Sequence, residues 1–135
     1  MKWFPQWFRT EASHLRTGRR GEKQAEQFLK KNGLEIIARN VRAGCDELDL
    51  IARQGDTLVF VEVKTRTNED FGRPIAAVNH AKRRKLSRAA ISFLKKHKLH
   101  PPHIRFDVVE VVVAKSEIRH IKNAFTLEGG YRIWW

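Results

Sequence analysis

The chain has 135 residues, enough for one domain with a single modest hydrophobic core. Its 27 Lys and Arg residues outnumber its 15 Asp and Glu residues, and the net charge of +12 favours polyanionic partners such as nucleic acid. The single cysteine excludes an intramolecular disulfide, and no apolar run approaches the roughly 20 residues that a membrane-spanning helix needs. We therefore expect a cytoplasmic protein with no membrane partner.

The first 16 residues are predicted to form a tail outside the domain. Four large aromatic side chains lie in it: Trp3, Phe4, Trp7 and Phe8. We expect these rings to pack on the domain, because clusters of aromatic side chains are normally covered; packing on a second subunit or on bases is the alternative. The domain itself is predicted to span residues 17–124, and residues 125–135 to form a C-terminal tail.

Residues 17–32 have the pattern of a helix. Thr17 is a possible N-cap, and Gly33 follows the last turn as a stop signal. The apolar face comprises Ala25, Phe28 and Leu29. Glu22 lies three residues before Ala25, which places this carboxylate on the inward side of the helix.

Three strands are predicted next, over residues 35–41, 47–53 and 57–65. Gln54-Gly55-Asp56 forms a tight turn between the second and the third. The third strand is almost continuously apolar, which is typical of a central strand covered on both faces. Alternation along it places Phe60, Glu62 and Lys64 on one face, and Asp49 shares a face of the second strand with Ile51.

The second half of the chain is predicted to contain one long helix and two strands. A loop over residues 67–78 precedes a helix over about 78–97, and strands follow over residues 105–113 and 116–123, the last at a sheet edge. The helix is expected to bury a stripe made of Leu86, Ala89, Ala90, Phe93 and Leu94. The order α-β-β-β-α-β-β indicates a single α/β domain in which helices flank a mixed central β-sheet.

Ionisable side chains interrupt these buried strands. Asp49, Glu62 and Lys64 would each cost several kcal/mol there unless a metal or a counter-charge compensates them. Mg²⁺ or Mn²⁺ prefers hard oxygen ligands, which Asp49, Glu62 and the main-chain carbonyl of Val63 can supply. Glu22 could support a second ion or hold a water. The alternative is an ion-paired cluster, Glu62–Lys64 or Asp49–Lys64, that only fixes the strand register.

At these positions the chain resembles a known family. Asp49 followed by Glu62-Val63-Lys64 resembles the signature of the PD-(D/E)xK nuclease superfamily, which includes restriction endonucleases and Holliday junction resolvases. Several motifs together resemble the YraN-like family of bacterial endonuclease-like proteins: Gly21-Glu22, Arg39-Asn40, Glu47-Leu-Asp49-Leu-Ile, Phe60-Val-Glu62-Val-Lys64-Thr-Arg66, Phe71-Gly72 and Arg105-Phe-Asp107-Val. The resemblance covers about residues 18–113.

The resemblance implies a restriction-endonuclease-like core and an active-site set of four residues: Glu22, Asp49, Glu62 and Lys64. It also makes a homodimer plausible. Leu48 stands where the superfamily name has proline. Asp46 stands in a turn where YraN-like proteins tend to have glycine, so it either alters the turn or adds a carboxylate at the rim.

Basic residues near this site are candidates for nucleic-acid contacts: Arg66, Lys82, Arg83, Arg84 and Arg88. A solvated basic helix face is the alternative. The function expected is that of a Mg²⁺- or Mn²⁺-dependent endonuclease acting on structured or branched DNA rather than RNA. A non-catalytic nucleic-acid-binding or assembly protein is the second hypothesis, and a purely structural basic domain the third. Asp107 is expected to form a structural ion pair, with Arg105 or with the basic helix.

Overall fold

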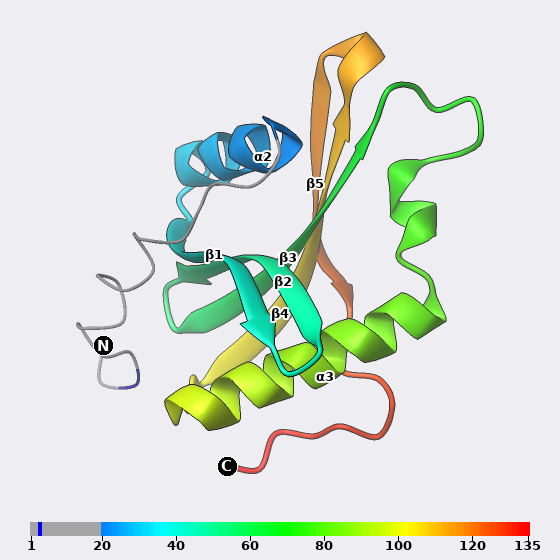
Figure 1. Ribbon diagram of the computed structural model, residues 1–135. Coiled ribbons are helices and arrows are strands. Elements are labelled where there is room, and N and C mark those ends of the chain that lie inside the picture. Colours follow the sequence, from blue (N-terminus) through cyan, green and yellow to red (C-terminus); the bar gives the residue numbers. More distant parts are fainter. Residues whose placement is uncertain (1–2, 4–19) are drawn as a thin grey trace.

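The computed structural model describes Trp3 and residues 20–135 (Figure 1). Its elements are helix α2 (Arg20–Lys31), strands β1 (Glu35–Ala43), β2 (Asp46–Gln54) and β3 (Thr57–Arg66), the 3₁₀ turn η1 (Pro74–Ala77), helix α3 (His80–His97), strand β4 (His103–Val112), the 3₁₀ turn η2 (Val113–Lys115) and strand β5 (Glu117–Phe125). This order confirms the predicted α-β-β-β-α-β-β arrangement. No helix of the described part is both long and apolar enough to cross a membrane.

The five strands form one mixed sheet in the order β1-β2-β3-β4-β5. Strands β1, β2 and β3 are antiparallel neighbours, as expected for strands joined by short turns. Strand β3 pairs with β4 in parallel, and α3 makes the crossover between them. Strand β5 adds antiparallel to β4 at the edge, as predicted.

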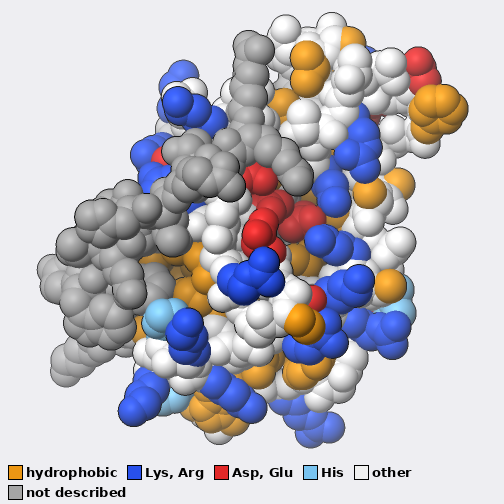
Figure 2. All heavy atoms as spheres, in the orientation of Figure 1, with side chains coloured by type: hydrophobic (Ala, Val, Ile, Leu, Met, Phe, Trp, Pro, Cys, Tyr) orange, Lys and Arg blue, Asp and Glu red, His pale blue; other side chains and the backbone are white. Residues whose placement is uncertain are grey.

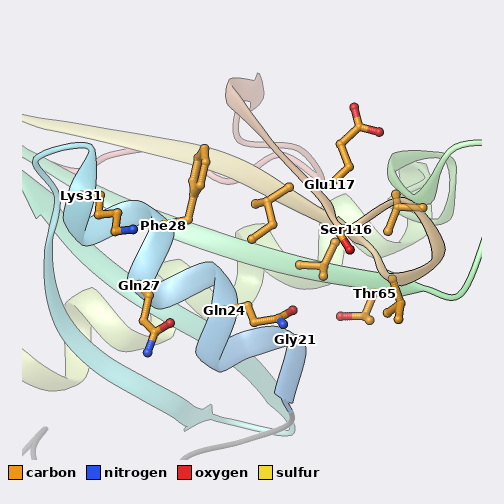
Figure 3. Close-up of a pocket in the computed structure, with 12 residues that line it drawn as sticks. Gly21, Gln24, Gln27, Phe28, Lys31, Thr65, Ser116 and Glu117 are labelled. Carbon is orange, nitrogen blue, oxygen red and sulfur yellow. The ribbon is translucent and has the colours of Figure 1, made fainter.

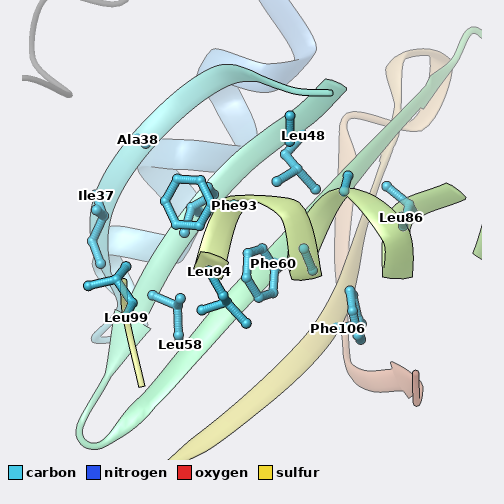
Figure 4. Packing of buried hydrophobic residues seen from close by; sticks show 14 of the residues in the cluster. Ile37, Ala38, Leu48, Leu58, Phe60, Leu86, Phe93, Leu94, Leu99 and Phe106 are labelled. Atoms are coloured by element: carbon cyan, nitrogen blue, oxygen red, sulfur yellow. The ribbon is translucent and has the colours of Figure 1, made fainter. Parts of the chain in front are cut away.

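The two helices cover opposite faces of this sheet and create two apolar cores. On one face, side chains of α3 pack on Phe60 and Phe106, whose ring centroids are 5.6 Å apart (Figure 4). On the other face, Ala25 and Leu29 of α2 pack on Val59, Val61 and Val63, among others. The alternation predicted for β3 is therefore confirmed, and the whole predicted stripe of α3 is buried.

Two local features differ from the sequence prediction. Helix α3 begins at His80 rather than near residue 78, because the Asn79 side chain accepts a hydrogen bond from the Lys82 N–H and caps the helix. The segment predicted as a loop over residues 67–78 contains a turn of 3₁₀ helix that starts at Pro74.

The described terminal residues pack against the domain. Trp3 lies on the core between the sheet and α3, whereas Phe4, Trp7 and Phe8 of the predicted aromatic tail, and the predicted cap Thr17, lie outside the described residues. At the other end, Trp134 and Trp135 contact the His100 ring, and the Trp135 indole N–H donates to the Pro101 carbonyl at 2.9 Å.

Candidate functional site

Strands β2 and β3 part at the position of the predicted acidic residues. Their ladder runs from the pair Gln54–Thr57 to the pair Leu50–Val61, which leaves Asp49 and Glu62 as the next positions on the two strands. The β1–β2 hairpin turns toward α3 there, while β3 continues past it (Figure 1). The Val63 N–H donates to Asp49 Oδ2 at 2.9 Å, so this side chain takes the place of a main-chain partner. The candidate site lies in this fork.

Glu62 is the most enclosed member of the site. Only 4% of its surface is exposed, and its Oε2 atom lies 3.5 Å from the Lys64 Nζ atom and 3.4 Å from the Lys82 Nζ atom. Lys64 comes from β3 and Lys82 from the first turns of α3. The other oxygen, Oε1, is buried and has no hydrogen-bond partner among the described residues. One side of this carboxylate therefore faces two ammonium groups, and the other retains a free acceptor.

The environment of Asp49 disfavours its charged form. Burial, followed by the negative charge of Glu62, raises the pKa of Asp49 to about 7, although the Val63 N–H and the Lys82 charge act in the opposite direction. Two neighbouring carboxylates cannot both ionise cheaply in a partly dry environment. Near neutral pH, full ionisation of this pair therefore requires additional positive charge.

A divalent cation fits this requirement. Asp49 and Glu62 offer hard oxygen donors, and a free buried acceptor on Glu62 is the kind of atom that an ion would satisfy. Within the described part of the chain, no group of three or more His, Cys, Asp or Glu side chains could hold a metal. An ion here would therefore take two carboxylates, with a main-chain oxygen such as that of Val63 and water completing its shell, as is common for Mg²⁺.

Glu22 lies on the helix that covers the other face of the sheet. It lies in the first turn of α2 and is only 8% exposed, which confirms the inward direction predicted from the sequence. The helix start packs directly on β3, because a Cβ atom on Gly21 would lie 2.0 Å from the Thr65 Oγ1 atom. Glu22 does not join Asp49 and Glu62 in a three-carboxylate group, so the structure brings together three of the four predicted site residues, with Lys64 as the third.

The five predicted nucleic-acid-binding residues differ in whether an acidic side chain of the protein pairs with them. Arg83 binds Glu128, and Arg88 makes a bidentate pair with Asp46, at 2.8 and 3.0 Å. Lys82 contacts Glu62, and Arg66 and Arg84 are exposed. Arg88 lowers the pKa of Asp46 through this bonding.

Asp46 therefore fastens the β1–β2 turn to α3. The acid at this position has a structural partner in the described chain.

Sequence reasoning missed one buried acid of the sheet, Glu110. Glu110 of β4 is fully buried and in register with Lys64. It accepts hydrogen bonds from Arg73 Nη2 at 2.7 Å and from the Ile75 N–H at 2.8 Å, and the Arg119 Nε atom lies 3.0 Å away. Glu110 thus fixes the segment that leads from β3 to α3. A charge within the run Val108-Val-Glu-Val-Val was the signal that could have revealed it.

Asp107 has the structural role predicted for it. Its carboxylate is fully buried and accepts two hydrogen bonds from Arg105, at 2.8 and 2.9 Å. The His120 ring and the Asn123 N–H also contact it, and these contacts secure the irregular pairing of β5 with β4. Bonding to His120, Arg105 and Asn123 outweighs burial and keeps the pKa of Asp107 below its ordinary value.

The candidate site is separate from a groove of about 430 Å³ between α2 and the β4–β5 end (Figure 3). Gln24, Phe28 and Lys31 extend into that groove from α2, whereas none of Asp49, Glu62 and Lys64 lines it. On the face shown in Figure 2, acidic side chains gather at the centre, with basic side chains beside and below them. This arrangement suits a ligand that spreads over a surface better than one enclosed in the groove.

Fold and site together define a small α/β protein with two carboxylates and two lysines at the fork of a mixed sheet. The profile of the uncharacterised protein family UPF0102 matches residues 21–111, and the chain belongs to this family. The resemblance to the YraN-like family is thereby confirmed, since the two names denote one family.

Similar proteins have the same family name. The UPF0102 protein of Symbiobacterium thermophilum is 49% identical over 113 residues, which cover 82% of this chain and 96% of that protein. The UPF0102 protein of Geotalea daltonii is 48% identical over 113 residues, covering 82% and 89%. That of Rhodococcus opacus is 41% identical over 117 residues, covering 84% and 99%. The names of these relatives state no reaction.

Proposed function

We propose that this protein is an endonuclease that hydrolyses phosphodiester bonds of nucleic acid with the help of Mg²⁺ or Mn²⁺. The observation that carries the proposal is the pair of the half-buried Asp49 and the buried Glu62, which lies beside two lysines where β2 and β3 part. A structural ion pair would need one acid and one base. This site combines two acids that repel each other with two ammonium groups at their border, which suits an ion and a phosphate.

Asp49 and Glu62 would hold the metal. When bound, the ion would supply charge stabilisation at the non-bridging phosphate oxygens and lower the pKa of a bound water. The Val63 N–H keeps the Asp49 carboxylate oriented, because it holds one of its oxygens at 2.9 Å. This bond fixes the direction of the other oxygen before any ligand arrives.

The two lysines would serve the substrate. Lys64 and Lys82 are 22% and 35% exposed, so both ammonium groups reach from the buried carboxylate to the surface. Once an ion neutralises Glu62, their charge becomes available for a phosphate. Lys64 would orient the attacking water by donating a hydrogen bond to it, and Lys82 would contact the phosphate from the α3 side.

The surrounding charge supports a nucleic-acid substrate. The net charge of +12 and the exposed Arg66 and Arg84 provide phosphate contacts that position a strand without reading its sequence. We propose DNA rather than RNA, and structured or branched DNA in particular, as the resemblance to resolvases implies. Assembly as a homodimer and a cytoplasmic location remain predictions.

One observation favours the alternative of a nucleic-acid-binding protein without activity. The two lysines already compensate Glu62 in the described structure, and a cluster of this kind can be stable with no ion. The alternative predicts nucleic-acid binding that is independent of divalent ions and of Asp49.

A cleavage assay separates these functions. Supercoiled, linear duplex, four-way-junction and single-stranded DNA are incubated with the protein and Mg²⁺ or Mn²⁺. We expect cleavage that disappears in Asp49→Ala, Glu62→Ala and Lys64→Ala while binding persists. Glu47→Gln, an exposed acid on the same strand as Asp49, is the matched control and should cleave normally. Binding without cleavage of any substrate by the wild type would establish the alternative.

A further inference from the structure

The segment between β3 and η1 lies along the chain between the two lysines of the candidate site. It begins three residues after Lys64 and leads through η1 to Lys82, and both lysines contact the same Glu62 oxygen. In Figure 1 this segment forms the loop at the upper right. Residues 67–73, called the β3–η1 loop below, extend from the end of β3 beyond the fork that holds the site.

Ion pairs and hydrogen bonds fix both sides of the β3–η1 loop. On one side Glu69 binds Arg119 and lies 2.8 Å from the Lys115 Nζ atom. On the other side Arg73 donates to the buried Glu110 at 2.7 Å. At the base, the Ala114 N–H donates to the Thr67 carbonyl at 2.7 Å. The loop is thus attached to β4, η2 and β5, so its tip has a defined position.

The tip of the loop presents one aromatic ring to solvent. The Gly72 N–H donates to the Glu69 carbonyl at 3.0 Å, which closes a tight turn with Asp70 and Phe71 at its centre. Gly72 adopts a φ of +109°, which glycine reaches without strain. Phe71 is fully exposed, with a relative exposure of 103%. Figure 2 shows hydrophobic and acidic side chains protruding at the upper right, where Figure 1 places this loop.

A fixed loop with an exposed ring has the physical properties of a stacking platform. Aromatic side chains gain most from burial, and a fully exposed phenyl ring forgoes that gain in the free protein. Its neighbours in sequence are polar or glycine, so the ring has no apolar surround of the kind that forms the centre of a protein interface. A nucleic-acid base needs only the face of a ring.

We propose that Phe71 stacks on an unpaired base of the nucleic-acid substrate. The inference rests on the proposed function and specifies its substrate: a strand with an unpaired base. Arg66, exposed at the end of β3, provides a phosphate contact between the site and the loop. Asp70 stands next to Phe71 at the tip, and its negative charge disfavours a phosphate at this position.

Affinity measurements on three variants test the role of the ring. Fluorescence anisotropy in a chelator, which prevents cleavage, compares a fully paired duplex with the same duplex carrying a one-base bulge. Replacing Phe71 with Leu keeps an apolar side chain but removes the ring, and should weaken bulge binding at least about fivefold. Phe71→Trp should retain the affinity. Val113→Ala, another exposed apolar position near the loop, is the matched control and should change nothing.

The outcomes distinguish the two proposals. If the wild type binds no nucleic acid, the proposed function fails and the inference fails with it. The stacking role alone is refuted if the wild type binds and Phe71→Leu binds both duplexes as tightly as the wild type does. It is also refuted if Phe71→Leu loses the same affinity for the bulged duplex as for the paired one. Sedimentation velocity covers the other use of an exposed ring: a change in oligomeric state in Phe71→Leu with unchanged DNA affinity would assign Phe71 to a contact between copies of the chain.

Discussion

Replacing Asp49 with Asn isolates the charge of the candidate site from its shape. The Asn side chain has nearly the same volume, and its carbonyl oxygen can accept the Val63 N–H bond that Asp49 now accepts. What the variant lacks is the negative charge next to Glu62. Without metal ions, we expect this variant to be more stable than the wild type at pH 8.

The size of the effect follows from the pKa of Asp49. It rises from an ordinary value of 3.8 to about 7 in the folded chain, chiefly because of burial and the Glu62 charge. The pKa differs by about three units between the folded and unfolded chain, and each unit corresponds to about 1.4 kcal/mol. The free energy of unfolding of the wild type is therefore lowered by at most about 4 kcal/mol at pH 8. The folded state binds a proton that the unfolded state has released between pH 3.8 and 7, so wild-type stability should fall across this window as pH rises.

Urea unfolding of both proteins at pH 5 and pH 8, in a chelator, measures this effect. The free energy of unfolding of Asp49→Asn should exceed that of the wild type by about 2 to 4 kcal/mol at pH 8 and by much less at pH 5. Asp46→Asn, on the same strand as Asp49, is the control, because bonding to Arg88 of α3 lowers the Asp46 pKa. That substitution should be destabilising at pH 8, and its effect should diminish as pH falls. A gain from Asp49→Asn that is equal at both pH values, or a loss at pH 8, would refute the electrostatic account.

Three further substitutions test other parts of the site. Lys82→Met should reduce cleavage about tenfold or more, whereas Lys85→Met, an exposed neighbour on α3, should leave the rate unchanged; equal rates in both would remove Lys82 from the site. Glu110→Gln should lower the free energy of unfolding in urea by about 3 kcal/mol and speed amide hydrogen exchange over residues 67–79. Unchanged exchange would show that Glu110 does not fix this segment. Gly21→Ala should cost about 1 to 3 kcal/mol by the same method, and Thr65→Ala should restore part of the loss; no recovery in the double variant would contradict the contact.

The sheet and the carboxylate pair could be predicted from the sequence because short-range patterns determine them. Strict alternation along β3 separates Phe60 from Val61 by face, and a buried strand makes any charge within it conspicuous. Asp49 and Glu62 were predicted to converge because a tight turn joins their strands, and the structure places them side by side where the ladder ends.

Pairings between distant segments could not be predicted in the same way. The sequence shows Arg83 and Arg88 as free cations on one helix face, but Glu128 and Asp46 reach them from 45 and 42 residues away along the chain. Such partners depend on how the β1–β2 turn and the C-terminal segment pack on α3. Phe71 raises the same problem, because no local pattern distinguishes an exposed ring on a fixed loop from one that packs on the domain.

Calorimetric titration of Mn²⁺ tests most directly whether the Asp49–Glu62 pair is a metal site. The account predicts saturable heat of binding to the wild type at pH 8, loss of that heat in Asp49→Asn and in Glu62→Gln, and full retention in Glu47→Gln, whose acid is exposed on the same strand. No binding by the wild type, or equal binding by Asp49→Asn, would contradict the metal site and leave a charge-compensated structural cluster in its place.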